Sequence, residues 1–290
     1  MYKCFQTIML LVSTCLHAAD PLPVIAVSTF PLQWVCQTLV GDRATVIHLT
    51  ANADMPREWV PDEDEAEMMQ QAALVLLQGG GYERWAENLT DPKYFRSSEA
   101  VYERFSELRK LGAEDKALYY ERCQGRAWLD PLHLELQAEA IRRLLEEQLG
   151  FQDLAEPLER VRRELREMGE DIPHAHRLRT GWVLGLNPVF EQTLTRAYGW
   201  NIRTAPPGFL QDDDPEDLNW KAFGEFFEFF PARLAIRGQE RGEGVAATLQ
   251  NHLRIHTSSF DFLDKQTDPD KTYPELMREN FTQLTSGFSP

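Results

Sequence analysis

Two patterns of hydrophobic and polar positions alternate along the chain. Short aliphatic runs without charges, such as residues 23–28 and 73–77, are typical of strands buried on both faces. Longer stretches with an apolar residue at every third or fourth position, such as 154–168, are typical of helices that bury one face. The two kinds of segment follow one another through most of the chain, which predicts parallel sheets covered by helices.

The first half is predicted to contain three strands and four helices. The expected strands are 23–28, 45–50 and 73–77, and the expected helices are 32–40, 63–71, 82–89 and 132–149. The last helix has the clearest start, because Asp130 suits the N-cap and Pro131 suits the first helical position. Gly79 to Gly81 lack the frame of a phosphate loop, so we expect a tight turn there. Residues 91–123 show no regular pattern.

The second half repeats the alternation after one long amphipathic helix. We expect strands at 181–186, 201–204, 233–237 and 255–260, and helices at 188–198, 218–230, 244–253 and 272–284. The fold class is therefore α/β, with two lobes that each hold a mainly parallel sheet and flanking helices, joined by one long rigid helix. The expected boundaries are an N-terminal lobe at 20–150, a connecting helix at 151–171 and a C-terminal lobe at 172–290. A ligand would lie in the cleft between the lobes.

The N-terminus has the layout of a secretory signal peptide. Lys3 precedes an apolar run that ends in the small residues Ala18 and Ala19, and the run is too short to span a membrane. We expect residues 1–19 to be cleaved and the protein to be periplasmic or otherwise extracytoplasmic. Lipid attachment at Cys15 is the alternative. Cys36 and Cys123 remain after cleavage, either as free thiols or as a disulfide.

Composition and motifs exclude several functions. The net charge of −16 argues against nucleic-acid binding, which needs clustered Lys and Arg. No nucleophile paired with a base and no cofactor loop emerges, so we expect neither an enzyme nor a bound cofactor. The acidic segment 212–217 is interpreted as a helix start and not as a calcium loop. The dense phenylalanines at 223–230 either pack the C-terminal lobe or form a partner surface.

Histidines offer few candidate metal ligands. His48, His133, His252 and His256 are isolated in the sequence and are interpreted as surface or core residues. His174 and His176 are the one close pair, and a displaced metal site there is a weaker alternative.

Six short motifs in order resemble one known family, the periplasmic solute-binding proteins of zinc and manganese ABC transporters. They are Gly41-Asp42-Arg43, Trp59-Val60-Pro61, the segment 76–85, Trp128-Leu129-Asp130-Pro131, Ala197-Tyr198-Gly199 and the segment 260–264. The resemblance covers nearly all of the mature chain. It implies capture of a solute in the cleft and delivery to an ABC transporter permease in the membrane.

The resemblance also places the family's metal ligands on four positions of this chain. They fall on Arg57, Arg126, Asn187 and Asp261, of which only Asp261 keeps a residue type that suits a metal. Arginine is always protonated and only donates hydrogen bonds, whereas zinc and manganese need lone pairs from imidazole, carboxylate or thiolate groups. We therefore expect a degenerate site without zinc or manganese.

Two interpretations of this altered site remain open. Arg57, Arg126 and Asn187 form a donor-rich set that suits a small anion. Alternatively, Asp261 pairs with Arg57 or Arg126 and closes the cleft. The function is then either that of a monomeric solute-binding protein with an altered ligand or that of a repurposed interaction protein that has lost small-solute binding.

Overall fold

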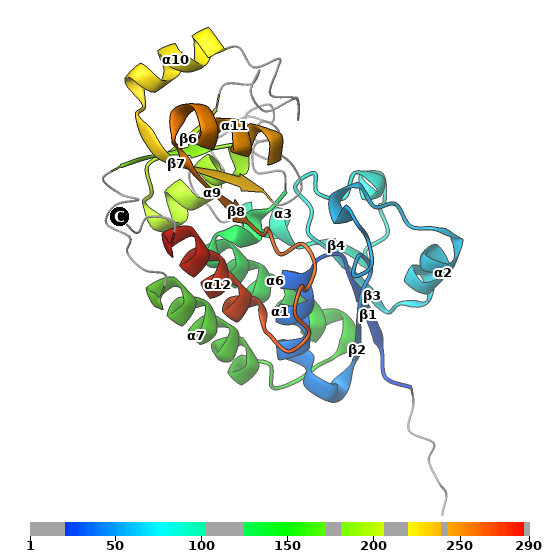
Figure 1. The fold of residues 1–290 in the computed structure, drawn as a ribbon. Helices are drawn as coiled ribbons and strands as arrows, with labels where there is room; N and C mark the ends of the chain where they lie inside the picture. Colours follow the sequence, from blue (N-terminus) through cyan, green and yellow to red (C-terminus); the bar gives the residue numbers. More distant parts are fainter. Residues whose placement is uncertain (1–20, 103–124, 172–180, 206–219, 239–242, 287–290) are drawn as a thin grey trace, which may run out of the picture.

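Two four-stranded parallel sheets form the frame of the molecule (Figure 1). The computed structural model describes residues 21–102, 125–171, 181–205, 220–238 and 243–286. The first sheet has the order β2 (Thr45–His48), β1 (Val24–Val27), β3 (Leu74–Leu77), β4 (Tyr94–Arg96). The second has the order β6 (Ile202–Thr204), β5 (Trp182–Gly185), β7 (Ala232–Gly238), β8 (His256–Phe260). All pairings are parallel, as the uncharged strand runs predict.

Helices cover both sheets. With the first sheet lie α1 (Phe30–Val40), α2 (Glu63–Gln71), α3 (Ser97–Tyr102) and α6 (Pro131–Leu149). With the second lie α9 (Pro188–Tyr198), α10 (Trp220–Phe229) and α11 (Glu243–Leu253). Two further helices, α7 (Ala155–Asp171) and α12 (Tyr273–Ser286), run alongside one another in Figure 1. Short 3-10 turns are η1 (Gly41–Arg43), η2 (Pro56–Glu58), η3 (Arg84–Ala86) and η4 (Ala127–Leu129).

Helix starts follow the predicted capping signals. The Asp130 side chain accepts a hydrogen bond from the backbone N–H of Leu132 at 2.9 Å, and Pro131 occupies the first turn of α6. Asn187 does the same for α9, where its Oδ1 accepts from the N–H of Val189 at 2.9 Å. Each cap satisfies a backbone donor that has no partner within its helix.

The helix α7 connects the two lobes through a shared core. Its predicted apolar stripe is buried, with an exposed fraction of at most 3% at Leu154, Leu158, Val161, Leu165 and Met168. These side chains pack against α1, α6 and α12. One hydrophobic cluster joins residues of both sheets to this stripe. The expected two-lobe architecture with a long rigid connecting helix is confirmed.

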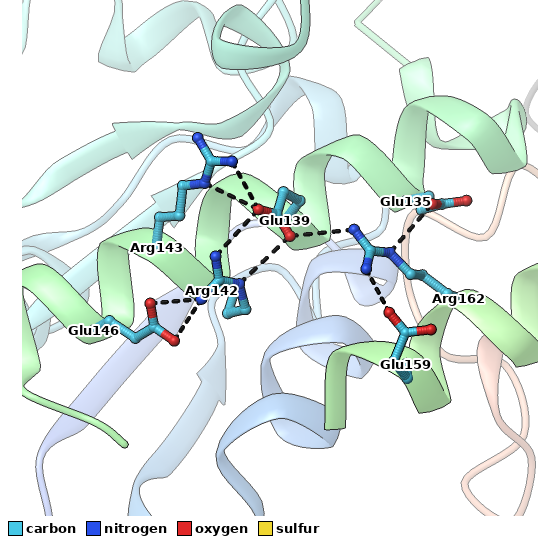
Figure 2. A network of polar contacts seen from close by, with 7 residues as sticks. All are labelled: Glu135, Glu139, Arg142, Arg143, Glu146, Glu159 and Arg162. Carbon is cyan, nitrogen blue, oxygen red and sulfur yellow. Dashed lines mark hydrogen bonds and ion pairs between the residues drawn. The ribbon is translucent and has the colours of Figure 1, made fainter. Parts of the chain in front are cut away.

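A network of ion pairs lies along the outer side of the contact between α6 and α7 (Figure 2). Arg162 of α7 pairs with Glu135 and Glu139 of α6, both at 3.3 Å. Glu139 also binds Arg142 at 3.1 Å and Arg143 at 2.9 Å. The arginine side chains keep between 20% and 51% of their surface exposed. All three arginines therefore keep contact with solvent, although Glu139 at the centre of the network is largely buried.

The sequence predictions differ from the structure at two places in the first lobe. The helix expected at 82–89 is wrong, because only the short turn η3 forms there and Glu83 folds back onto the preceding glycines. The segment 91–123 was expected to be irregular, but it contains β4 and α3. Both elements are short and polar, so they carry no strong hydrophobic period.

Several predicted features lie outside the described residues. These are the signal peptide with Cys15, and also Cys123, His174, His176 and the acidic segment 212–217. Cys36 is a free, fully buried thiol whose pKa burial raises to about 12. Among the described helices, none is both long enough and apolar enough to cross a membrane.

Candidate functional site

Arg126 is the centre of the candidate site. It lies immediately before η4 and α6, and its side chain is completely buried. Its guanidinium group pairs with the carboxylate of Asp264, at 3.1 Å from Nη2 to Oδ2 and 3.2 Å from Nε to Oδ1. Asp264 follows β8, so this ion pair joins the segment before α6 to the C-terminal lobe. A buried charge needs such a partner, because desolvation alone would disfavour it strongly.

Asp264 gathers further contacts from the first lobe. The hydroxyl group of Tyr82 donates a hydrogen bond to Asp264 Oδ1 at 2.6 Å. The backbone carbonyl group of Asp264 accepts from the N–H of Phe30 at 3.0 Å. Burial and the neighbouring carboxylate raise the pKa of Tyr82 well above its usual value, so Tyr82 stays a protonated donor. The Asp264 carboxylate is thereby held by two side chains of the first lobe.

Aromatic residues surround the ion pair and exclude water. The Arg126 Cζ atom lies 4.1 Å from the centroid of the Phe262 ring. Trp128 donates from Nε1 to the Phe262 carbonyl group at 2.8 Å, and the Tyr273 hydroxyl group donates to the Trp128 carbonyl group at 2.8 Å. These contacts fix the segment that follows β8 against η4. The hydrogen bond from the Trp128 indole N–H explains why a tryptophan suits this fully buried position.

Gly125 allows this close approach. Its φ is +72°, and a Cβ atom at this position would lie 2.5 Å from the Cβ atom of Tyr82. Any other residue would therefore push Arg126 and Tyr82 apart.

The side chain of Asp261, a predicted ligand, forms a hydrogen bond within a local turn. Its Oδ1 accepts from the N–H of Leu263 at 2.8 Å, and Leu263 has a positive φ of 57°. The Asn280 side chain bonds to both backbone groups of Asp261. Burial, followed by the charge of Asp264, raises the pKa of the Asp261 carboxyl group, whereas the Leu263 bond and Arg126 lower it.

The structure brings together only part of the predicted set. Arg126 and Asp261 lie close enough to interact electrostatically. Arg126 forms an ion pair with Asp264, however, and not with Asp261, which one of the two open interpretations paired with Arg57 or Arg126. Arg57 is half-buried in η2, and Asn187 serves as the N-cap of α9. The contacts among described residues do not join Arg57 or Asn187 to the pair.

Glu83 is a second buried carboxylate that sequence analysis missed. It accepts hydrogen bonds from the Ser28 hydroxyl group at 2.5 Å and from the backbone N–H groups of Gln78 and Gly79 at 2.7 and 2.9 Å. Burial raises its pKa, and these three bonds lower it. The first backbone donors of the glycine turn are thus occupied by the protein itself. The interpretation of Gly79 to Gly81 as a structural turn is confirmed, since all three have positive φ.

The histidines placed by the structure either make contacts within the fold or lie on the surface. His48 contacts the Thr50 hydroxyl group at 3.0 Å, and burial lowers its pKa to about 4. His133 is buried beside Arg196, and burial likewise lowers its pKa to about 4. His256 is exposed on β8. Within the described ranges, no group of three or more His, Cys, Asp or Glu side chains has an arrangement that could hold a metal ion.

Comparisons with known proteins agree with this architecture. Solved structures with similar folds include the metal-dependent lipoprotein YcdH of Bacillus subtilis, with a TM-score of 0.71 and 14% identity over 91% of this chain and 98% of that one. The laminin-binding protein Lmb of Streptococcus agalactiae has a TM-score of 0.71 and 17% identity, over 93% of this chain and 100% of that one. A zinc-bound mutant of AdcAII from Streptococcus pneumoniae has a TM-score of 0.69 and 18% identity, over 92% of this chain and 99% of that one. These identities establish a common fold.

Family membership rests on the sequence itself. No curated protein sequence matches the chain. The family model for ZnuA, described as the periplasmic component A of the zinc-uptake complex, matches residues 25–287. Proteins of this family are extracytoplasmic and work with ABC transporter permeases. The chain therefore belongs to the ZnuA family of periplasmic solute-binding proteins.

Proposed function

We propose that this chain is an exported ZnuA-family protein that does not carry zinc or manganese at the family's four ligand positions and acts through its surface on a protein partner. The observation that carries the proposal is the buried ion pair between Arg126 and Asp264. It balances charge at the junction of the lobes without any bound cation. Arg126 occupies a position at which the family provides a lone pair to the metal, but its guanidinium group can only donate hydrogen bonds.

The remaining positions support the same proposal. The Asn187 side-chain oxygen caps α9, and Asp261 Oδ1 accepts a backbone N–H within its own turn. Each of these hydrogen bonds already uses one lone pair of an oxygen that the family would turn towards the metal. A divalent ion would also be repelled by the guanidinium groups of Arg57 and Arg126.

The proposal includes the organisation of the precursor. Residues 1–19 act as a cleaved signal peptide, with lipidation of Cys15 as the alternative. The lobes extend over 20–150 and 172–290, with the connecting helix at 151–171. The mature chain acts as a monomer outside the cytoplasm, with an ABC transporter permease as its expected membrane partner.

A second candidate function is the binding of a small anion near the lobe junction. It is supported by cationic groups around the loop of residues 51–58, which contains Arg57. Lys265 reaches this loop, where its Nζ donates to the Ala53 carbonyl group at 3.0 Å. Inorganic phosphate, sulfate or acetate would then raise the melting temperature of the mature protein. Unchanged melting with all three would eliminate this candidate.

Restoring the ligand types tests the main proposal. We expect calorimetric titration of the mature protein with zinc or manganese to give no stoichiometric binding. A variant that combines Arg57→His, Arg126→His and Asp264→Ala removes both guanidinium groups and should gain zinc affinity. Adding Asp261→Asn to this variant is the matched control and should weaken the gain. Circular dichroism of each variant verifies that it is folded.

Tight zinc binding could arise at two places, and only the first would count against the main proposal. Tight stoichiometric zinc in the unmodified protein, lost on Asp261→Asn, would mean that the inherited site still works. Tight zinc that is instead lost on replacing His174 and His176 with alanine would assign metal binding to that pair.

A further inference from the structure

The first sheet changes its winding direction between β1 and β3. Its strand order is β2-β1-β3-β4, so the chain leaves β1 towards β2 and later returns past β1 to form β3. The connecting helices lie on opposite faces, because α1 belongs to the main core cluster and Met69 of α2 belongs to the cluster on the other face. In open α/β sheets, ligands bind outside the carboxyl ends of the strands at such a switch point.

Buried polar side chains follow the strands at this edge and lack hydrogen-bond partners. They are Thr29 after β1, Gln78 after β3 and Ser98 after β4, and all three residues are completely buried. Within the described part of the chain, the two hydroxyl groups and both polar atoms of the Gln78 amide have no partner. Buried polar groups are normally paired with protein, water or a ligand, because leaving them unpaired is unfavourable.

The strand register places Thr29 beside Gln78. Val27 of β1 pairs with Leu76 of β3, and the two polar residues each come two positions later. The strands stay together past these ends, since the Gln78 N–H donates to Ser28 Oγ at 3.1 Å. The backbone of Thr29 is also extended. Side chains two positions apart on an extended strand share a face, so Thr29 and Gln78 lie on the face covered by α1.

The Thr29 hydroxyl group is not used by the helix that it precedes. Thr29 is the N-cap of α1, but its side chain makes no hydrogen bond to the backbone of that helix. The N-caps of α2, α6 and α9, which are Asp62, Asp130 and Asn187, all make such a bond. The Thr29 hydroxyl group can therefore bind a ligand without uncapping α1.

The neighbouring groups favour a neutral ligand. Glu83 Oε1 accepts from the Gln78 N–H at 2.7 Å, so this buried carboxylate would repel an anion. A cation would leave the Gln78 Nε2 donor without an acceptor. The side chain of Gln78 presents one acceptor and one donor group side by side, which match the donor and acceptor of another amide. A hydroxyl group such as that of Thr29 can add a bond of either kind.

Asp264 closes this edge of the sheet. Phe30, the residue after Thr29, donates its N–H to the Asp264 carbonyl group at 3.0 Å. Tyr82, which ends the glycine turn after Gln78, donates its hydroxyl group to Asp264 Oδ1 at 2.6 Å. Asp264 thus holds the segments that continue from both strand ends. Because Thr29 and Gln78 are completely buried, we expect a ligand to enter when Asp264 moves away from the first lobe.

We propose that the ends of β1 and β3 form a binding site for a small neutral molecule of the amide class, held by the Thr29 hydroxyl group and the Gln78 side-chain amide. The site uses none of the family's four metal-ligand positions. The inference therefore goes beyond the proposed function and does not depend on the absence of metal from the lobe junction.

Acetamide and acetate are matched probes for this site. They have similar shapes, but only acetamide is neutral and able to donate a hydrogen bond. Ligand-observed NMR titration of the complete mature protein measures both affinities. We expect saturable binding of acetamide and binding of acetate that is weaker by about tenfold, since a hydrogen bond is lost and a charge is added.

Variants of the two proposed contacts locate the bound acetamide. Gln78→Leu should weaken its binding by about tenfold, and Thr29→Val should weaken it less. Thr193→Val is the control and should leave the affinity unchanged, because Thr193 is a buried threonine of α9 whose hydroxyl group donates to the Val189 carbonyl group. Circular dichroism verifies folding. If Gln78→Leu does not fold, Gln78→Glu keeps the size of the side chain and removes its donor.

Three results would overturn the proposal. They are no saturable binding of acetamide, equal acetamide affinity in the unmodified protein and the Gln78 variant, and acetate binding as tight as that of acetamide. Acetate binding that Arg57→Ala abolishes would instead support the small-anion candidate. None of these results would alter the metal titrations, so this proposal and the proposed function fail separately.

Discussion

Two groups of charged residues join elements in this molecule, and they differ in almost every physical respect. The pair of Arg126 and Asp264 is buried and is in contact with Tyr82 and Phe262. The network on α6 and α7 is larger (Figure 2), and its arginine side chains are between 20% and 51% exposed. The pair joins residues 138 positions apart, whereas the network joins the consecutive helices α6 and α7. The comparison shows that the number of ion pairs in a group does not indicate how strongly its loss would lower the stability of the fold.

Solvation explains why removing a charged residue should affect stability differently in the two groups. Removing one member of a buried pair leaves the other charge without water and without a partner, which typically costs about 3–5 kcal/mol. Exposed pairs exchange a protein partner for water and contribute about 0–1 kcal/mol. The single pair at the lobe junction should therefore dominate, although it is not expected to stabilise the fold relative to an apolar replacement.

The largest effect is expected from removing one partner of the buried pair. Arg126→Ala or Asp264→Ala should lower the free energy of unfolding by about 3–5 kcal/mol. Urea denaturation followed by tryptophan fluorescence measures this loss. The double variant Arg126→Met with Asp264→Leu should recover most of it, because both charges of the pair are removed together. A loss below about 1 kcal/mol in both single variants would contradict the buried-pair account.

The next effect concerns pH and His48, whose folded-state pKa is about 4 against an ordinary value of 6.5. Between these values the unfolded state binds a proton that the folded state does not, so stability falls as the pH decreases from 6.5 to 4. His48 accounts for at most about 3 kcal/mol of this loss of stability. The difference in unfolding free energy between the unmodified protein and His48→Gln isolates it from His133. A difference independent of pH would refute the assignment.

A smaller effect is expected at Tyr82. Tyr82→Phe removes one hydrogen bond to Asp264 but leaves the Arg126 pair, so the loss should be about 1.5 kcal/mol. Chemical denaturation measures it, and Tyr94→Phe on the half-exposed edge strand β4 is a control that should change little. A loss as large as that of Asp264→Ala would mean that the hydroxyl group, and not the ion pair, holds the segment.

The smallest effect is expected in the network of Figure 2. Arg142→Ala should cost less than about 1 kcal/mol, and the cost should shrink further in 1 M salt. Thermal unfolding at low and high salt tests this. A salt-independent loss comparable with that of Arg126→Ala would remove the distinction between the two groups.

Local signals explain how much of the fold was predictable from the sequence. Asp130 with Pro131, and Asn187 with Pro188, start helices through bonds within two residues, so sequence alone locates them. The stripe of α7 follows from a simple period. The elements β4 and α3 lack such a signal, and their formation depends on tertiary contacts, since β4 pairs with β3 and α3 packs against α6.

The site was less predictable because its key contact is long-range. Arg126 and Asp264 are 138 positions apart, and no local pattern links them. Asp264 was overlooked in favour of Asp261, three residues earlier. The turn at Leu263 decides between the two carboxylates, and its positive φ is a tertiary feature that propensity does not predict. Glu83 was missed for a similar reason, since its bonds to Ser28 and Gln78 form only in the folded sheet.

Metal content tests the central claim most directly. The mature protein would be incubated with zinc and manganese, freed of excess metal and analysed by mass spectrometry, beside its Arg126→Ala variant. The account predicts far less than one tightly held ion per chain in both. One ion per chain in the unmodified protein that Asp261→Asn abolishes would contradict the claim that the lobe junction is closed to metal by an internal ion pair.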